Sequence, residues 1–186
     1  MDLPLELPDE CPTFDGVRLR AFRDTDVPML LDLSTDPYVP ATGSLPANAT
    51  PEEALAYIER QRDRLVTGAG YSFCAAVEAT DEAIGQAGLW LRSIDEGRAT
   101  AGYYVAPAAR GHGFAARSLT ALTTFAWTVA EVERVELYIE PWNAASIKAA
   151  ERAGFSREGL LRSHQAIGGQ RVDMCLFAAV RPRASG

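Results

Sequence analysis

The sequence is poor in the residues that metal centres and disulfide frameworks require. It has three cysteines and two histidines in 186 residues. Cys11, Cys74 and Cys175 are widely spaced and form no C-x-x-C pair. Scattered cysteines in an odd number argue against a disulfide framework and against structural zinc, and they favour a reducing, cytoplasmic compartment. We therefore expect no bound metal.

The chain also lacks a long apolar run and an excess of positive charge. No stretch reaches the roughly 20 apolar residues that cross a bilayer, and the acidic start MDLPLELPDE does not resemble a signal peptide. The formal net charge is −7, whereas a nucleic-acid-binding domain normally presents a basic face. We expect neither a membrane nor a nucleic acid as a partner.

No repeat, low-complexity tract or linker divides the chain. Its content of 47% hydrophobic and 23% charged residues is that of a soluble globular protein. The sequence therefore predicts one domain over residues 1–186, with residues 1–12 and 181–186 as loose ends.

Hydrophobic periodicity predicts alternating strands and helices. Strands are expected at 17–22, 71–78, 83–93, 98–105, 133–139 and 172–180, with at least one more near the C-terminus. Helices are expected at 24–34, from Thr50 with Leu55, Ile58 and Leu65 on one face, at 113–127 and at 143–154. Residues 35–50 and 163–170 are expected as loops. This order predicts a mixed α/β sheet rather than a doubly wound dinucleotide fold.

The segment YYVAPAARGHGFAARSLTAL, residues 103–122, places an Arg-Gly-His-Gly turn between a predicted strand and a predicted helix. Helices usually begin with Ser, Thr, Asp or Asn, which satisfy the first backbone N–H groups. Without such a cap, these N–H groups stay open for an anion at the positive end of the helix. Residues 110–115 also match R-x-x-G-x-A, whose glycines permit a tight turn and close approach of a ligand. The alternative is an ordinary glycine-rich turn beside a solvated arginine.

A second pattern lies further along, in IEPWNAASIKAAERAGFSREGLLR. It contains Asn143 and Ser146 in N-x-x-S, followed by Gly154-Phe155. Taken alone, Asn143 and Ser146 are a helix cap and a first-turn polar residue. In the order strand, R-x-x-G-x-A, helix, strand, N-x-x-S, helix and Gly-Phe, the two patterns resemble the GNAT superfamily of acyl-CoA-dependent N-acyltransferases. Within it, the sequence is most similar to the RimJ/RimL-type ribosomal-protein N-terminal acetyltransferases and the polyamine acetyltransferases.

The resemblance implies a single-domain α/β (α+β) fold. Its mixed, mostly antiparallel sheet has about seven strands, splays at the cofactor site and is flanked by about four helices. It implies acetyl-CoA as the acyl donor, whose pyrophosphate the turn holds and whose pantetheine arm pairs with the preceding strand. Carried over to this sequence, the expected cofactor-binding residues are Tyr103, Tyr104, Val105, Arg110, Gly111, His112, Gly113, Phe114, Ala115, Asn143 and Ser146.

The resemblance also implies direct attack of a primary amine on the thioester, with a peptide N-terminus, a lysine or a small-molecule amine as acceptor. Many relatives have a tyrosine as acid where this chain has Ala150, which leaves Ser146 as candidate acid or hydrogen-bond donor to the thiolate. Some N-terminal acetyltransferases have a glutamate where this chain has Gln165. The base is therefore His164, a water relay, or none if the amine has a low pKa.

Two alternative functions stay open at this point: transfer from another acyl donor such as succinyl-CoA, and a non-catalytic acyl-CoA-binding module. A homodimer is a possible assembly that the sequence leaves open.

In the family, the loops expected at 35–50 and 163–170 border the acceptor. No acidic residue lies between Pro37 and Thr50, and none lies in 163–170. Because each desolvated ammonium needs a partner, this composition disfavours polyamines as acceptors.

Overall fold

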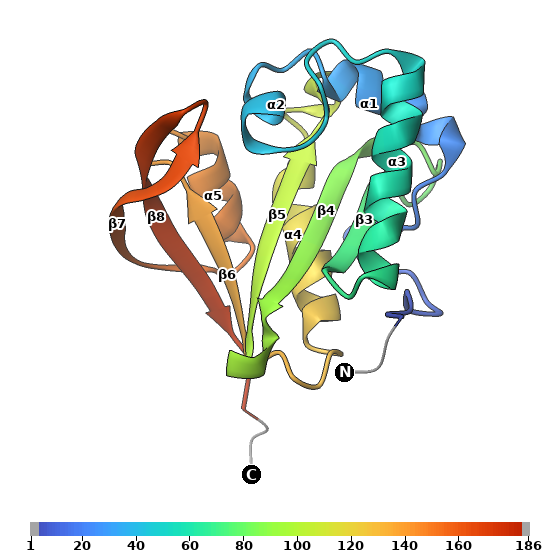
Figure 1. Cartoon of the computed structure of the whole chain (residues 1–186). Helices are drawn as coiled ribbons and strands as arrows, with labels where there is room; N and C mark the ends of the chain where they lie inside the picture. Colours follow the sequence, from blue (N-terminus) through green and yellow to red (C-terminus); the bar gives the residue numbers. More distant parts are fainter. Residues whose placement is uncertain (1–3, 184–186) are drawn as a thin grey trace.

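The computed structural model describes residues 4–183. Within that range it has one eight-stranded sheet with α-helices on both faces (Figure 1). The strands are β1 (Thr13–Phe14), β2 (Val17–Arg20), β3 (Gly70–Val77), β4 (Ala83–Ser93), β5 (Arg98–Val105), β6 (Arg134–Ile139), β7 (Ser156–Ile167) and β8 (Gln170–Val180). The α-helices are α1 (Val27–Leu33), α2 (Tyr38–Thr42), α3 (Pro51–Val66), α4 (Phe114–Ala126) and α5 (Ala144–Arg152).

The sheet confirms the expected mixed and mostly antiparallel α/β fold. Its strand order is β1-β2-β3-β4-β5-β6-β8-β7. All neighbours are antiparallel except β5 and β6, which are parallel and pair only between 98–100 and 134–136. Beyond Thr100 the two strands diverge, so the sheet splays open toward the C-terminal ends of β5 and β6 (Figure 1).

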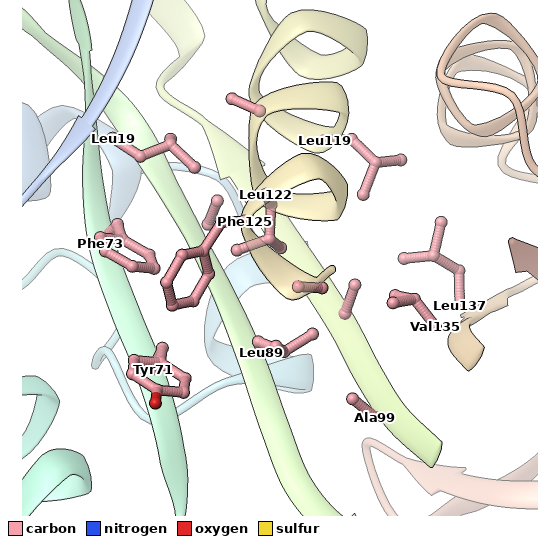
Figure 2. Close-up of a cluster of buried hydrophobic side chains, with 14 of the residues drawn as sticks. Leu19, Tyr71, Phe73, Leu89, Ala99, Leu119, Leu122, Phe125, Val135 and Leu137 are labelled. Carbon is pink, nitrogen blue, oxygen red and sulfur yellow. The ribbon is translucent and has the colours of Figure 1, made fainter. Parts of the chain in front are cut away.

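One core lies between the sheet and α4. Leu122 and Phe125 of α4 lie beside Phe73 and Leu89 of the sheet, and Leu119 is on the side of α4 that faces Leu137 of β6 (Figure 2). Fully burying one such side chain contributes about 1.5–3 kcal/mol. This packing holds the N-terminal end of α4 in a fixed position beside the end of β5.

A second core on the opposite face joins α1, α2 and α3 to the sheet. The predicted cap of α3 is present: the Thr50 hydroxyl accepts from the Glu53 N–H, and the Glu53 carboxylate accepts from the Thr50 N–H. Ile58 is fully buried, but Leu55 was expected on the same face and is 39% exposed. The buried stripe instead runs through Ala54, Tyr57, Ile58 and Gln61, one residue out of phase with Leu55.

Both expected loops contain regular structure. Residues 35–50 include the short helix α2. Most of 163–170 belongs to a long hairpin, because β7 continues to Ile167 and β8 begins at Gln170. Gly168 and Gly169, with φ of +56° and +79°, form the two-residue turn, a conformation that glycine adopts without steric cost. The two short elements, β1 and α2, raise the strand and helix numbers above those expected.

Parts of the two expected loose ends are anchored. Leu5 is buried, and its N–H donates to the Leu65 carbonyl at 2.9 Å. The Arg181 guanidinium donates to the carbonyl groups of Trp127, Val129 and Val132. Residues 1–3 and 184–186 lie outside the described range.

Candidate functional site

The Gly-rich turn leads directly into α4. Gly111 and Gly113 have φ of +86° and +77°, which L side chains rarely adopt. Gly113 is the N-cap of α4, and no side chain caps this helix. Within the described residues, no protein group accepts a hydrogen bond from the N–H groups of 111–115. These donors stand at the positive end of the α4 dipole and are suited to an anion.

A cavity of about 540 Å³ opens in front of this turn. We call it the first cavity. It is lined by the end of β5, the turn, the start of α4, the start of α5 and the segment around α2. Every expected cofactor-binding residue except His112 contributes to its lining. The turn, the strand and the N-x-x-S segment, far apart in sequence, therefore meet at one site.

The His112 side chain faces elsewhere. It lines a separate cleft beside α1, its Nδ1 lies 3.3 Å from the Ala109 carbonyl oxygen, and its ring lies 5.6 Å from that of Phe114. His112 was expected to bind the cofactor, but only its backbone N–H belongs to the turn that faces the first cavity.

Arg110 is held by protein groups rather than extended into the cavity. Its Nε donates to the Val105 carbonyl at 3.1 Å, and its guanidinium pairs with the Asp36 carboxylate. Partial burial by itself raises the pKa of Asp36, but the hydrogen bonds from Arg110 and from the Tyr38 N–H hold that pKa below its ordinary value. Arg110 thus fastens the turn to the segment that begins α2.

A second cavity of about 220 Å³ lies in the splay between β5 and β6. It adjoins the first cavity at a junction of five residues that line both: Tyr38, Tyr103, Tyr104, Asn143 and Ser146. Among the described residues that line the second cavity, none is charged and several are aromatic, including Trp90 and Tyr138. A small uncharged group fits this environment better than a polycation.

Asn143 and Ser146 have different roles at the start of α5. The Asn143 side chain caps α5 by accepting from the Ser146 N–H at 3.1 Å. The predicted cap is therefore present, and Ser146 contributes its backbone to it rather than its hydroxyl. The Ser146 hydroxyl takes no part in this cap, and it lies at the junction beside the side chain of Tyr103.

The candidate base His164 is not brought into either cavity. It lies on β7, where its exposed ring stacks on Tyr138 with ring centroids 5.0 Å apart. Its neighbour Gln165 lines the second cavity instead. The pairing of β7 with β8 is irregular between Leu161 and Gln165, where Ser163 has a φ of +50°.

Sequence reasoning missed Tyr38, which lies at the junction on α2. Pro40 and Gly43 made this segment resemble a loop, yet a proline fits a five-residue helix, whose first N–H groups have no intrahelical partner. One local signal was available: the Asp36 carboxylate accepts from the Tyr38 N–H at 2.8 Å, as aspartate does at helix starts. Trp142 was also missed; it lines the first cavity and packs edge-on against Tyr38.

Over residues 4–183, no group of three or more His, Cys, Asp or Glu side chains could hold a metal ion. In the same range, no helix is both long and apolar enough to span a membrane.

Comparisons with known proteins agree with this geometry. Residues 17–156 match the acetyltransferase (GNAT) domain family. The chain is 29% identical over 172 residues to the uncharacterized N-acetyltransferase p20 of Bacillus licheniformis, covering 92% of this chain and 97% of that protein.

Two solved structures illustrate the likeness of fold. A putative ribosomal-protein-serine acetyltransferase from Vibrio cholerae has a TM-score of 0.77 at 20% identity, covering 95% of this chain and all of that one. Mycobacterium smegmatis RimJ, in complex with CoA-disulfide, has a TM-score of 0.75 at 23% identity, covering 92% and 84% of the two chains. The chain belongs to the acetyltransferase (GNAT) family, as its motifs indicated, and is an acyl-CoA-dependent N-acetyltransferase.

Proposed function

We propose that this protein transfers the acetyl group of acetyl-CoA to a primary amine by direct attack in a ternary complex. The observation that carries the proposal is the meeting of the two cavities at the splay of the sheet. One has an open row of N–H donors for an anionic cofactor, and the other is small and uncharged.

The turn supplies the anion-binding end of the proposed site. The free N–H groups of 111–115 and the dipole of α4 suit the two negative charges of a pyrophosphate. No cationic side chain is needed there, which agrees with the engagement of Arg110 by Asp36.

β5 supplies the next contact. Its pairing with β6 ends at Thr100, whereas its pairing with β4 continues to Val105. The backbone groups of β5 beyond Thr100 that face the splay are therefore left without a strand partner. An extended chain carrying amide groups, such as the pantetheine arm, can pair with such an edge. The thioester then reaches the junction beside Asn143 and Ser146.

The acceptor side favours an amine of low charge. A polyamine brings additional ammonium groups, each of which needs a carboxylate when desolvated, and no charged residue among those described lines the second cavity. We propose a peptide N-terminus, a lysine or a small amine with a single charge. The same lining disfavours a succinyl donor, whose free carboxylate would need a cation there.

Ser146 has the proposed role of hydrogen-bond donor to the departing thiolate. Its hydroxyl is at the junction, beside the Tyr103 side chain, and takes no part in the cap of α5, whereas a covalent route would need a cysteine there. Cys74 and Cys175 are buried, and neither they nor Cys11 line the two cavities.

A thiol-release assay with acetyl-CoA and a panel of amines tests the proposal. The panel contains short peptides, N-acetyl-lysine methyl ester, simple monoamines and spermidine, and succinyl-CoA serves as a second donor. We expect release with acetyl-CoA and a peptide or monoamine. Binding of acetyl-CoA without release for every amine would favour the non-catalytic alternative, and faster release with spermidine than with peptides would contradict the assignment of the acceptor.

A further inference from the structure

The structure buries a carboxylate next to the junction. Glu140 directly follows β6 and is only 7% exposed. Its Oε2 atom is buried and accepts no hydrogen bond from any described protein group. Burying a carboxylate oxygen without a donor is costly in free energy. A protein that retains such a group outside its ion-pair networks commonly uses it at a functional site.

The neighbour of this carboxylate is Tyr38 of α2. Tyr38 lines both cavities, and its neighbours Trp142 and Asn143 follow Glu140 closely in the chain. Burial and then the nearby Glu140 carboxylate raise the pKa of Tyr38, and the Asn143 side chain partly offsets them. The phenol is therefore protonated at neutral pH. The Tyr38 ring packs edge-on against Trp142, with ring centroids 5.3 Å apart. This packing holds the ring at the wall of both cavities.

Three phenols lie at the junction, and their partners differ. The Tyr103 hydroxyl donates to the Ser146 backbone carbonyl at 3.5 Å. The Tyr104 hydroxyl lies 2.9 Å from the Thr42 hydroxyl. Neither of these partners is an ionised group. A carboxylate also acts on Tyr104, but it is that of Asp36, which is paired with Arg110, whereas Tyr38 lies near Glu140, whose Oε2 has no described hydrogen-bond donor.

The other charged groups near Tyr38 are occupied. The Asp36 carboxylate, at the start of α2, accepts from the Tyr38 N–H and pairs with Arg110 from the turn. Tyr104 of β5 is the remaining titratable group that acts on the Tyr38 hydroxyl. A proton that reaches Tyr38 from the cavity therefore has Glu140 as its available acceptor.

We propose that Tyr38, backed by Glu140, moves the proton of the attacking amine, an inference that rests on the function proposed above. As the amine nitrogen bonds to the acyl carbon, it gives a proton to the Tyr38 oxygen, and Tyr38 passes its own proton to Glu140. The carbon–sulfur bond breaks, and the thiolate takes a proton from Tyr38 as Glu140 returns one. The pair ends unchanged, and one proton has moved from nitrogen to sulfur.

This proposal fills two positions that the sequence left open. The tyrosine that many relatives have seven residues after the motif asparagine is Ala150 here, and Ala150 is fully buried. His164, the candidate base, is stacked on Tyr138 outside both cavities. Tyr38 supplies a phenol to the junction from a different element, and Glu140 supplies a buried carboxylate behind it.

The first test is Tyr38→Phe, which keeps the ring and its contact with Trp142. We expect kcat to fall by about 100-fold, the lower end of typical general acid–base contributions, with the Kd of acetyl-CoA changed less than twofold. Tyr71→Phe is the matched control: it removes a phenol from the core between the sheet and α4 (Figure 2), where Tyr71 lines neither cavity, and should leave kcat unchanged. Equal kcat for Tyr38→Phe and the wild type would overturn the proposal.

Glu140 acts through Tyr38, so its test measures the thermal midpoint of unfolding as well as kcat. A structural role would lower both quantities together. Glu140→Gln removes a buried charge while keeping the shape, so the thermal midpoint should stay constant or rise while kcat falls at least tenfold. Glu140→Asp should restore part of kcat. If Glu140→Gln lowered both the thermal midpoint and kcat, Glu140 would have a structural role instead.

The wild-type assay separates the two levels of inference. No thiol release by the wild type with any amine would overturn the proposed function, and this inference with it. Release by the wild type that survives both Tyr38→Phe and Glu140→Gln would overturn the proton-transfer role alone.

Discussion

Gly113 illustrates how one residue shapes the cofactor site. Its φ of +77° is in the left-handed region, and no atom within 4 Å would touch a Cβ placed there. The space into which that Cβ points is thus open to the first cavity or to solvent rather than filled by protein. A non-glycine residue is still strained there by about 1–2 kcal/mol. A charged and an uncharged substitution carry the same strain, so comparing them isolates the effect of charge.

We predict that Gly113→Glu lowers acetyl-CoA affinity by roughly 100-fold or more, because its carboxylate stands where the pyrophosphate binds. Gly113→Ala carries the same backbone strain without the charge and should lose far less affinity. Isothermal titration calorimetry on folded variants measures both. Unchanged affinity in Gly113→Glu would exclude this turn as the pyrophosphate site.

Ser146 is the second residue whose role can be isolated. Because Asn143 caps α5 and Ser146 contributes only its N–H to that cap, Ser146→Ala should leave the thermal midpoint nearly constant. If the hydroxyl stabilises the thiolate, kcat should fall about tenfold, the equivalent of roughly 1.5 kcal/mol for a hydrogen bond to a charged group. Asn143→Ala, by contrast, should lower stability by about 1 kcal/mol through loss of the cap. A fully active Ser146→Ala variant would remove Ser146 from the chemistry.

Among the elements, the segment that begins α2 and the turn before α4 are tied by the side chains of Asp36 and Arg110. Arg110 and Asp36 are 74 positions apart, and their side chains are 50% and 16% exposed. A partly exposed pair of this kind contributes about 0.2–1 kcal/mol. Its consequence is positional, since it places α2, and therefore Tyr38, over the cavity that the turn borders.

We predict that Arg110→Ala and Asp36→Asn each raise the KM for acetyl-CoA by at most about fivefold, the equivalent of up to 1 kcal/mol. The double variant should be no worse than either single one, because both remove the same tether. If Arg110 contacted the phosphates directly, the result would differ: Arg110→Ala would raise the KM for acetyl-CoA much more than Asp36→Asn does. Steady-state kinetics on the four proteins of the cycle distinguish these cases.

At the scale of the whole molecule, a buried ion network joins distant parts of the fold. Arg20 of β2 donates two hydrogen bonds to Asp26, at 2.9 and 2.8 Å, and a third to Asp81 in the turn between β3 and β4. Asp26 is 2% exposed. Burial alone raises the pKa of Asp26, but the hydrogen bonds from Arg20 and Arg23 more than offset burial and hold the pKa below its ordinary value.

The sign of this shift sets the pH dependence. An aspartate whose folded-state pKa is depressed contributes stability above its unfolded pKa of about 3.9, and this contribution is lost as the pH falls through the folded-state pKa. We predict a constant contribution from pH 5 to 7 and a decline below about pH 4. Asp26→Asn should cost about 3 kcal/mol at pH 7, because it leaves the buried Arg20 short of a partner, and its urea midpoint should decline less steeply with acid. An equally steep decline in the variant would place the acid-sensitive groups elsewhere.

The parts of the fold that sequence reasoning predicted correctly depend on residues that are close together in the chain. The capping box of α3 uses Thr50 and Glu53, and the strand β6 alternates Val135, Leu137 and Ile139 toward the core. Such signals act within one turn of helix or one strand. Leu55 shows the limit of the method, because the choice between two adjacent helical stripes depends on the partner that the helix packs against.

The sequence by itself determined the family, the uncapped glycine turn, the helix cap at Asn143 and most residues that line the first cavity. Each depends on local backbone chemistry or on a motif of fixed spacing. Only the tertiary structure decided that Arg110 pairs with Asp36, that the exposed His164 ring lies outside both cavities, and that Tyr38 of α2 lines the junction near the buried Glu140. Tyr38 and Glu140 lie on elements about a hundred positions apart, and no local rule relates them. They lie near each other because β5 and β6 diverge after three paired residues and α2 lies beside the opening.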